Sequence, residues 1–302
     1  MSVRTQTAGV TLADGRRLDA VAAGPADGLA FVLHTGTPSG PVPFAPMIEA
    51  ATARGLRTIL YARPGYAGST PRPGRTVADA AGDVAAILDA LDHAEFVTAG
   101  WSGGGPHALA CAALLPGRCR AAATIAGVAP HDAPGLDWLA GMGPENVTEF
   151  SAAIAGEAPL TEFLDQVADH LRTVTGEQIT AALGGLLCDA DKAVLSDEFA
   201  DYMASAFRAA LATGLAGWRD DDLAFVHPWG FTPDDLQTAG TPVAIWQGND
   251  DRMVPAPHGR WLATHLPGAH PHLLPNEGHL SLPLGAFGTI LDDLLELSGV
   301  IR

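Results

Sequence analysis

Residues 95–115 read Glu-Phe-Val-Thr-Ala-Gly-Trp-Ser-Gly-Gly-Gly-Pro-His-Ala-Leu-Ala-Cys-Ala-Ala-Leu-Leu. Residues 95–99 are typical of a short buried strand, and the apolar run 107–115 favours a helix. Between them stands Ser102 on a tight turn flanked by glycines, which allow strand and helix to approach closely. A serine on such a strand-to-helix turn has its hydroxyl lifted clear of the sheet, so we interpret Ser102 as a candidate nucleophile.

Strand-like and helix-like segments alternate on both sides of this turn. Asp14-Gly15 between the first two strands is a hairpin signal. The predicted strands are 6–12, 17–23, 30–33, 57–61, 95–99, 120–126, 242–246 and 270–274, and the main predicted helices are 43–54, 76–91, 107–115, 256–266 and 285–298. Strands separated by helices predict an α/β fold with an eight-stranded, mostly parallel sheet covered by helices on both faces.

Residues 129–238 interrupt this alternation. They carry apolar residues at helical spacing, as in Phe163, Val167 and Leu171, and we predict that they form a helical cap. The cap is expected over the carboxyl edge of the sheet, where open α/β sheets bind ligands. Residues 1–128 and 239–302 are then the α/β core.

Composition narrows the classes of partner. The chain has 302 residues, 47% of them hydrophobic, and a formal net charge of −17, which disfavours nucleic acid and anionic membranes as partners. No apolar run is long enough for a membrane span, and the N-terminal residues have no apolar signal-peptide region. Cys111, Cys119 and Cys188 form no CxxC pair and are expected to be free thiols in a reducing compartment, so we expect a cytoplasmic protein.

A serine hydroxyl needs a base to act as a nucleophile at neutral pH. His279 follows the last predicted strand by a short loop, which places it at the same edge of the sheet as Ser102. The histidine in turn needs an acid to hold its tautomer, and either Asp250 or Asp251 serves by position. Oxyanion donors are expected from the amide of Gly103 and from the loop 34–38.

Metal and cofactor sites are not expected. His265, His270 and His272 have a suggestive spacing, but no cysteine or glutamate completes a ligand set. The glycines after Ser102 are not followed by the Gly-Lys-Ser/Thr of a phosphate-binding loop. We therefore predict neither a metal ion nor a cofactor, and a small molecule as substrate.

The order serine, aspartate, histidine, with an oxyanion loop upstream, resembles the α/β-hydrolase family over about residues 5–128 and 239–300. The family's Gly-x-x-Asp-x-x-Val-Pro pattern matches residues 248–255, and this resemblance selects Asp251 over Asp250. The segment 61–69 is similar to the family's Arg-x-Gly-x-Gly-x-Ser region, with a shifted glycine.

The oxyanion loop departs from the family's His-Gly-x-Pro pattern, because Thr35 stands between His34 and Gly36. When the pattern is anchored on Gly36-Thr37-Pro38, the resemblance implies that the Thr37 N–H is the second oxyanion donor. Members that are haloalkane dehalogenases or epoxide hydrolases use an aspartate nucleophile, so Ser102 argues against both activities.

The resemblance therefore implies a carboxylesterase-like serine hydrolase. Ser102 would form an acyl-enzyme with a small or medium carboxylic ester, or a lactone, and water activated by His279 would release the acid. Because the base must be neutral, we expect activity to fall below about pH 6, near the pKa of an unperturbed histidine. Five residues are candidates to line the substrate pocket: Trp101, Trp138, Met142, Trp218 and Trp229.

Two other functions stay open. An aminopeptidase similar to proline iminopeptidase would need cap acids to bind the substrate's α-amine, and five are available: Glu145, Glu149, Asp220, Asp221 and Asp222. A ligand receptor on the same scaffold would bind its ligand tightly with almost no turnover.

Overall fold

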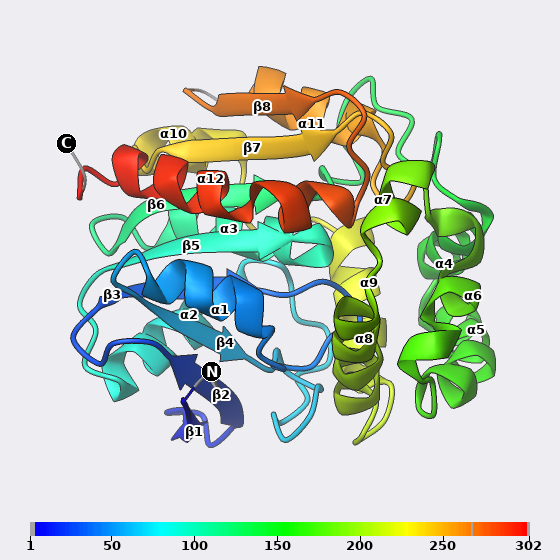
Figure 1. The fold of residues 1–302 in the computed structure, drawn as a ribbon, viewed down its shortest axis with the longest axis horizontal. Helices are drawn as coiled ribbons and strands as arrows, with labels where there is room; N and C mark the ends of the chain where they lie inside the picture. Colours follow the sequence, from blue (N-terminus) through cyan, green and yellow to red (C-terminus); the bar gives the residue numbers. More distant parts are fainter. Residues whose placement is uncertain (1–3, 267, 301–302) are drawn as a thin grey trace.

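An eight-stranded sheet runs through the centre of the molecule in the computed structural model, which describes residues 4–266 and 268–300 (Figure 1). The strand order is β1-β2-β4-β3-β5-β6-β7-β8, and pairing is parallel from β4 to β8. The strands are β1 Thr5–Thr11, β2 Arg17–Ala23, β3 Leu29–His34, β4 Leu56–Tyr61, β5 Phe96–Trp101, β6 Cys119–Ile125, β7 Val243–Gly248 and β8 His270–Leu274. The predicted mostly parallel sheet is therefore confirmed.

The first two strands form the predicted antiparallel hairpin, with Thr11 opposite Arg17. The central strands lack polar–apolar alternation because helices cover both of their faces, and every residue of β4 and of β7 is buried. Their side chains belong to the main hydrophobic core.

Helices cover both faces of the sheet. Helices α1 (Ala45–Thr52) and α12 (Ser281–Leu297) pack together on one face, and Figure 1 shows them in front of the strands. Helices α2 (Asp79–Ala90) and α3 (Gly105–Leu114) lie on the other face, while α10 (Pro233–Ala239) packs on α3 and α11 (Ala256–His265) packs on β7 and β8.

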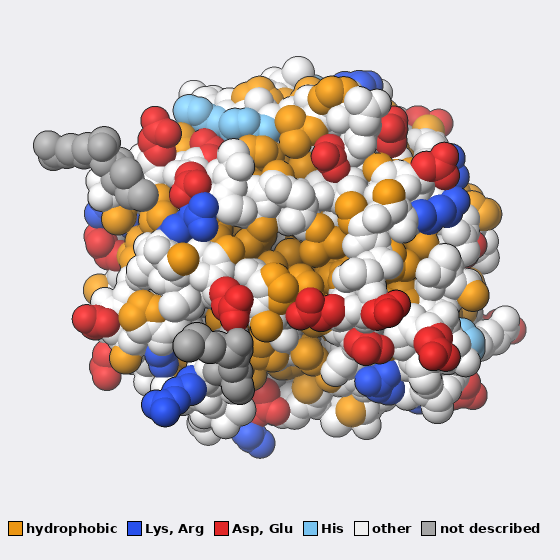
Figure 2. Space-filling view, viewed as in Figure 1, with side chains coloured by type: hydrophobic (Ala, Val, Ile, Leu, Met, Phe, Trp, Pro, Cys, Tyr) orange, Lys and Arg blue, Asp and Glu red, His pale blue; other side chains and the backbone are white. Residues whose placement is uncertain are grey.

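The segment between β6 and α10, which we call the insertion, is helical. It carries α4 Pro144–Ala155, α5 Glu157–Leu171, α6 Ile179–Leu183, α7 Asp189–Val194, α8 Asp197–Ala210 and α9 Ala216–Val226. In Figure 1 these green to yellow helices stand beside the arrowheads of β5 and β7, at the carboxyl edge of the sheet. Figure 2, viewed from the same side as Figure 1, shows hydrophobic side chains in the middle of the visible surface, with charged side chains around them.

Two helices begin three or four residues away from their predicted starts. Helix α2 starts at Asp79 because Thr76 is held in the preceding turn, where its N–H donates to the Asp79 carboxylate at 2.7 Å. Helix α12 starts at Ser281, four residues before the predicted start at 285. The amides of Leu280 and Ser281 at its start donate to the carboxylate of Asp191 in the insertion. No helix within 4–266 and 268–300 is long and apolar enough to cross a membrane.

Candidate active site

Ser102 lies between β5 and α3, in the short 3₁₀ turn Ser102–Gly104. Its φ is +57°, a left-handed conformation that costs a non-glycine residue about 1–3 kcal/mol and is concentrated at functional sites. A Cβ on Gly100 would collide with the carbonyl of Gly104, and one on Gly104 would collide with the carbonyl of His34. The glycines of the motif therefore let the turn pack against β3 and α3 while Ser102 points outward.

The side chain of Ser102 lines a cavity between the core and the insertion. His279, on the loop between β8 and α12, lines the wall of the same cavity. The Nδ1 atom of His279 lies 2.8 Å from Oδ2 of Asp251. The other oxygen of Asp251 accepts the backbone N–H groups of Met253 and Val254, each at 2.8 Å. Asp251 is thus held in place and fixes the orientation of the imidazole through Nδ1, a contact that does not involve Nε2.

The structure brings Asp251, and not Asp250, to the histidine. Asp250 is exposed at the surface, and its N–H donates to the carbonyl of Glu277. The position of the two aspartates on the loop did not distinguish between them. The family resemblance selected Asp251, which is the aspartate that contacts His279.

The charge of Asp251 changes the basicity of His279. Burial by itself would lower the pKa of the imidazole, but attraction to Asp251 and the hydrogen bond to it outweigh burial, with a smaller contribution from Asp191. The pKa of His279 is therefore raised above its ordinary value of 6.5. His34 and His258, both buried, have pKa values lowered by burial to about 3 and about 4 and stay neutral.

The loop after β3 packs against the Ser102 turn. A Cβ on Gly36 would touch the side chain of Ser102, and one on Gly103 would collide with the side chain of Thr37. The two residues predicted as oxyanion donors, Thr37 and Gly103, are therefore neighbours beside the candidate nucleophile.

A buried ionic cluster fixes this loop to the insertion. Asp221 of α9 accepts the Thr37 hydroxyl at 2.8 Å and the Tyr66 hydroxyl at 2.8 Å. It also pairs with Arg63 at 2.5 Å and Arg75 at 2.7 Å, and all three charged side chains are at most 2% exposed. Burial would raise the pKa of Asp221, but the two guanidinium groups hold it well below its usual range.

Arg63 extends this cluster to the backbone of the loop. Its guanidinium donates to the carbonyl oxygens of Thr35 at 2.7 Å and Gly36 at 2.9 Å. The sequence had indicated Arg63 only as part of a family motif, and Asp221 only as one of several cap acids. That the two residues pair was not foreseeable, because they are 158 residues apart in the chain.

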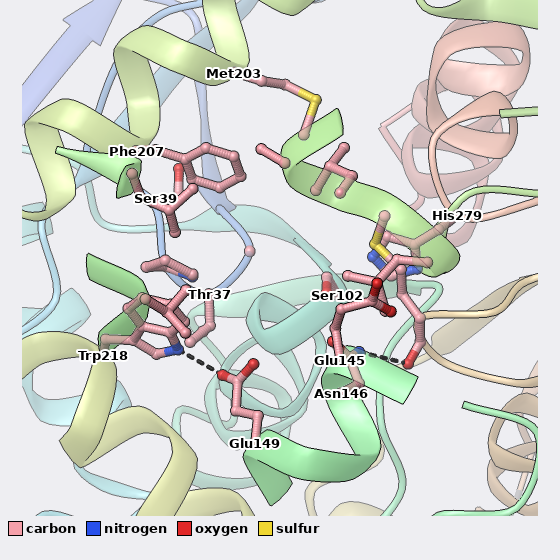
Figure 3. A pocket seen from close by; sticks show the side chains of 18 of the residues that line it. Thr37, Ser39, Ser102, Glu145, Asn146, Glu149, Met203, Phe207, Trp218 and His279 are labelled. Carbon is pink, nitrogen blue, oxygen red and sulfur yellow. Dashed lines mark hydrogen bonds between the residues drawn. The ribbon is translucent and has the colours of Figure 1, made fainter. Parts of the chain in front are cut away.

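Two other acids of the insertion face Ser102. Glu149 of α4 and Asp222 of α9 help to line a small chamber of about 40 Å³ beside Ser102 and Gly103. Trp218 donates its indole N–H to Glu149 at 2.6 Å, as Figure 3 shows. Burial raises the pKa of both carboxyl groups, and the nearby charge of Glu149 raises the pKa of Asp222 further. Two buried carboxyl groups this close together do not readily ionise at the same time.

Asp220 and Glu145, also predicted as amine-binding acids, each contact another group of the protein. Asp220 pairs with Arg219 at 2.8 Å, and Glu145 accepts the N–H of Gly185 at 2.8 Å while lining the larger cavity.

The larger cavity, of about 500 Å³, lies between the Ser102 turn and the insertion. Figure 3 shows Thr37 and Ser102 on one side of it, with Met203 and Phe207 of α8 on another. Its wall is mostly apolar and includes these side chains: Phe163, Val167, Leu171, Leu183, Leu186, Tyr202, Met203 and Phe207. The spacing of residues 163, 167 and 171 predicted a helical segment. It did not predict that these three side chains line the cavity.

Of the five predicted pocket residues, Trp101 and Trp218 line the larger cavity. The structure does not place Trp138, Met142 and Trp229 in the wall of either cavity. Trp138 packs edge-on against Phe150 and donates its indole N–H to the carbonyl of Ala129 at 2.7 Å. Met142 and Trp229 are buried in the hydrophobic core, because large apolar side chains of an insertion also have to pack its own helices together.

The eight-stranded sheet, the strand-to-helix turn and the inserted helices define a class of hydrolases. The chain belongs to the alpha/beta hydrolase fold family, which it matches over residues 30–286. Among curated proteins it is similar to a non-heme chloroperoxidase from Streptomyces lividans, with 29% identity over 248 residues, 82% of this chain and 83% of the relative.

Two solved structures show the same fold. One is a bromoperoxidase from Bacillus anthracis, with a TM-score of 0.70, 19% identity and coverage of 96% of this chain and all of the other. The second is an enol-lactonase from Burkholderia xenovorans LB400, with a TM-score of 0.66, 21% identity and the same coverage. At these identities the similarity establishes the fold.

Proposed function

We propose that the protein is a serine hydrolase that cleaves a small or medium carboxylic ester, or a lactone, through an acyl-enzyme on Ser102. The observation that carries the proposal is the arrangement around one cavity. Ser102 stands on a turn with φ +57°, and His279, whose Nδ1 is bound by Asp251 at 2.8 Å, lines the same wall. Nucleophile, base and orienting acid in this relation are the requirements of acyl transfer by serine.

In this mechanism Oγ of Ser102 attacks the carbonyl carbon while Nε2 of His279 takes the hydroxyl proton. Asp251 stabilises the imidazolium that forms. The amides of Gly103 and Thr37 donate to the oxyanion, and loss of one such donor reduces kcat by about 10²–10³. The alcohol leaves with the proton from His279, and water then attacks the acyl-enzyme with His279 again as base. The carboxylic acid departs and Ser102 regains its proton.

The cavity supports an ester with an apolar group. A volume of about 500 Å³ is within the range of small-molecule sites, about 300–1,000 Å³, and its wall is mostly apolar. In this proposal the insertion is a cap that supplies most of this wall, while the core supplies the reacting groups.

A second candidate is an aminopeptidase similar to proline iminopeptidase. The specific observation in its favour is the buried pair Glu149 and Asp222 beside Ser102, since a pair that keeps one negative charge suits an ammonium group. Asp221, by contrast, is neutralised by Arg63 and Arg75 and is not available to an amine.

Hydrolysis of p-nitrophenyl esters from acetate to decanoate by the wild type and Ser102→Ala tests the proposal. We expect turnover only in the wild type, and the preferred chain length measures the cavity. Turnover that persists in a folded Ser102→Ala variant contradicts the mechanism. If the folded wild type hydrolyses none of the esters but cleaves a proline naphthylamide, the protein is an aminopeptidase. If it binds ligands without turning any of them over, it is a receptor.

A further inference from the structure

Asp191 is a wholly buried carboxylate on α7, in the insertion. Its two oxygens accept three consecutive backbone N–H groups of another part of the chain. Oδ2 accepts from His279 at 3.2 Å, and Oδ1 accepts from Leu280 at 2.7 Å and Ser281 at 3.0 Å. The proposed catalytic base is thus held through its own main chain by a residue 88 positions earlier.

Two of these amides, those of Leu280 and Ser281, are among the ones that the start of α12 leaves without partners inside the helix. An N-cap side chain ordinarily binds one of the free amides of the first turn, but the N-cap of α12 is Leu280, which has no acceptor. The Ser281 hydroxyl is used differently, because it accepts the N–H of Gly278 at 2.7 Å. Asp191 therefore takes the part of a local cap, which explains why α12 can begin at Ser281, two residues after His279.

The approach of the insertion to this loop depends on a glycine. A Cβ on Gly278 would collide with the carboxylate of Asp191 and with the sulfur of Cys188. Cys188 is also the N-cap of α7, where its sulfur accepts the N–H of Asp191 at 3.5 Å. The first turn of α7 is thus built against the residue that precedes His279.

Two carboxylates face His279 from different elements. Asp251, on the loop after β7, holds the ring at Nδ1, and Asp191, on α7, holds the backbone. From β5, the ring of Trp101 lies 5.9 Å from the imidazole, and its indole N–H donates to the His279 carbonyl at 3.1 Å. The charges of Asp251 and Asp191 both favour the protonated imidazole and so raise the pKa of His279.

We propose that Asp191 is a positioning residue for His279, through which docking of the insertion sets the geometry of the base. This inference rests on the proposed role of His279 in ester hydrolysis. Asp191 does not line either cavity, and it acts on His279 through the backbone of residues 279–281 and through its charge. Movement of α7 away from the loop removes three hydrogen bonds and one negative charge from the base together.

The test compares Asp191→Asn with Asp191→Ala and uses Asp189→Asn as the control. Asparagine keeps the volume and one acceptor oxygen but removes the charge, whereas alanine removes every acceptor. Asp189 is on the same helix, fully exposed, and pairs only loosely with Lys192 at 3.5 Å. We expect Asp191→Ala to lower kcat by about 10²-fold with a smaller change in KM, since small misplacements of a catalytic group have effects of this size.

A nuclear magnetic resonance titration of the His279 imidazole needs no substrate and separates this inference from the proposed function. We expect the pKa of His279 to fall in both Asp191 variants and to be unchanged in Asp189→Asn. The acid limb of kcat/KM should move with it. If Ser102→Ala keeps esterase activity while the titration still shifts, the proposed function fails and the contact to His279 stands.

The inference is overturned if Asp191→Asn leaves both the His279 titration and kcat at wild-type values. It is also overturned if the variants only lower the thermal midpoint while the pH profile stays the same, because a purely structural role predicts that result. Should Asp191→Ala fail to fold, Asp191→Asn decides the matter. Gly278→Ala adds an independent perturbation, because the new Cβ would collide with the carboxylate of Asp191 and displace it from residues 279–281. The pKa of His279 should therefore fall in this variant as well.

Discussion

Replacing Asp221 by asparagine should have a large effect on both stability and turnover. The carboxylate is the common partner of Arg63, Arg75, Tyr66 and Thr37, and its side chain has no exposed surface. Asparagine has the same shape but leaves two buried guanidinium groups without their counter-charge. Breaking a buried ion pair from one side typically costs about 3–5 kcal/mol.

The neighbouring acids reduce this cost. The charge of Asp221 raises the pKa of Asp222, so removing that charge favours the ionised form of Asp222. One additional negative charge near Arg75 partly replaces the lost one, so we expect about 3 kcal/mol, toward the lower end of the range. In a chain of 302 residues a loss of that size lowers Tm by roughly 5 °C.

Turnover should fall as well, because the same carboxylate holds the loop that carries Thr37. Without it, the hydroxyl of Thr37 loses a partner at 2.8 Å, and Arg63 is less constrained where it binds the carbonyls of Thr35 and Gly36. A loosened oxyanion donor weakens the transition state more than the bound substrate, so kcat should drop more than KM rises.

Urea unfolding at neutral pH and p-nitrophenyl ester kinetics measure the two effects. Asp292→Asn is the matched control, since Asp292 makes a two-point contact with Arg54 at 2.6 and 2.8 Å but is 58% exposed. An exposed pair of this kind contributes about 0–1 kcal/mol. If Asp221→Asn costs no more than Asp292→Asn and leaves kcat unchanged, the reasoning from burial is wrong.

Three further results are expected. The acid limb of kcat/KM should lie above pH 6.5, because neutral His279 is required and its pKa is raised; an apparent pKa at or below 6.5 in the pH–rate profile would contradict this. Phe207→Ala should move the preferred p-nitrophenyl ester toward longer chains because Phe207 lines the cavity, whereas Trp138→Phe should keep the preference and lower only the thermal midpoint. Glu149→Gln should spare esterase activity while abolishing any cleavage of a proline naphthylamide, and equal loss of both activities would argue against an amine site at Glu149 and Asp222.

Much of the fold could be predicted from local patterns. The strand-to-helix turn at Ser102, the Asp14-Gly15 hairpin and the spacing of apolar residues depend on the conformational preferences of neighbouring residues. The predicted strands therefore match the observed ones to within one or two residues. The early start of α12 was missed because its first amides are bound by Asp191, which no nearby pattern indicates.

The sequence by itself determined the order of the elements, the serine on its turn and the histidine and acidic loop that follow. Only the tertiary structure decided which carboxylates remain available around Ser102. Five acids of the insertion looked equivalent in the sequence, yet Asp221 is neutralised by two arginines and Glu149 is paired with Asp222. The physical reason is that the charge state of a buried acid depends on partners brought together by folding, and Asp221 and Arg63 are separated by 158 residues of chain.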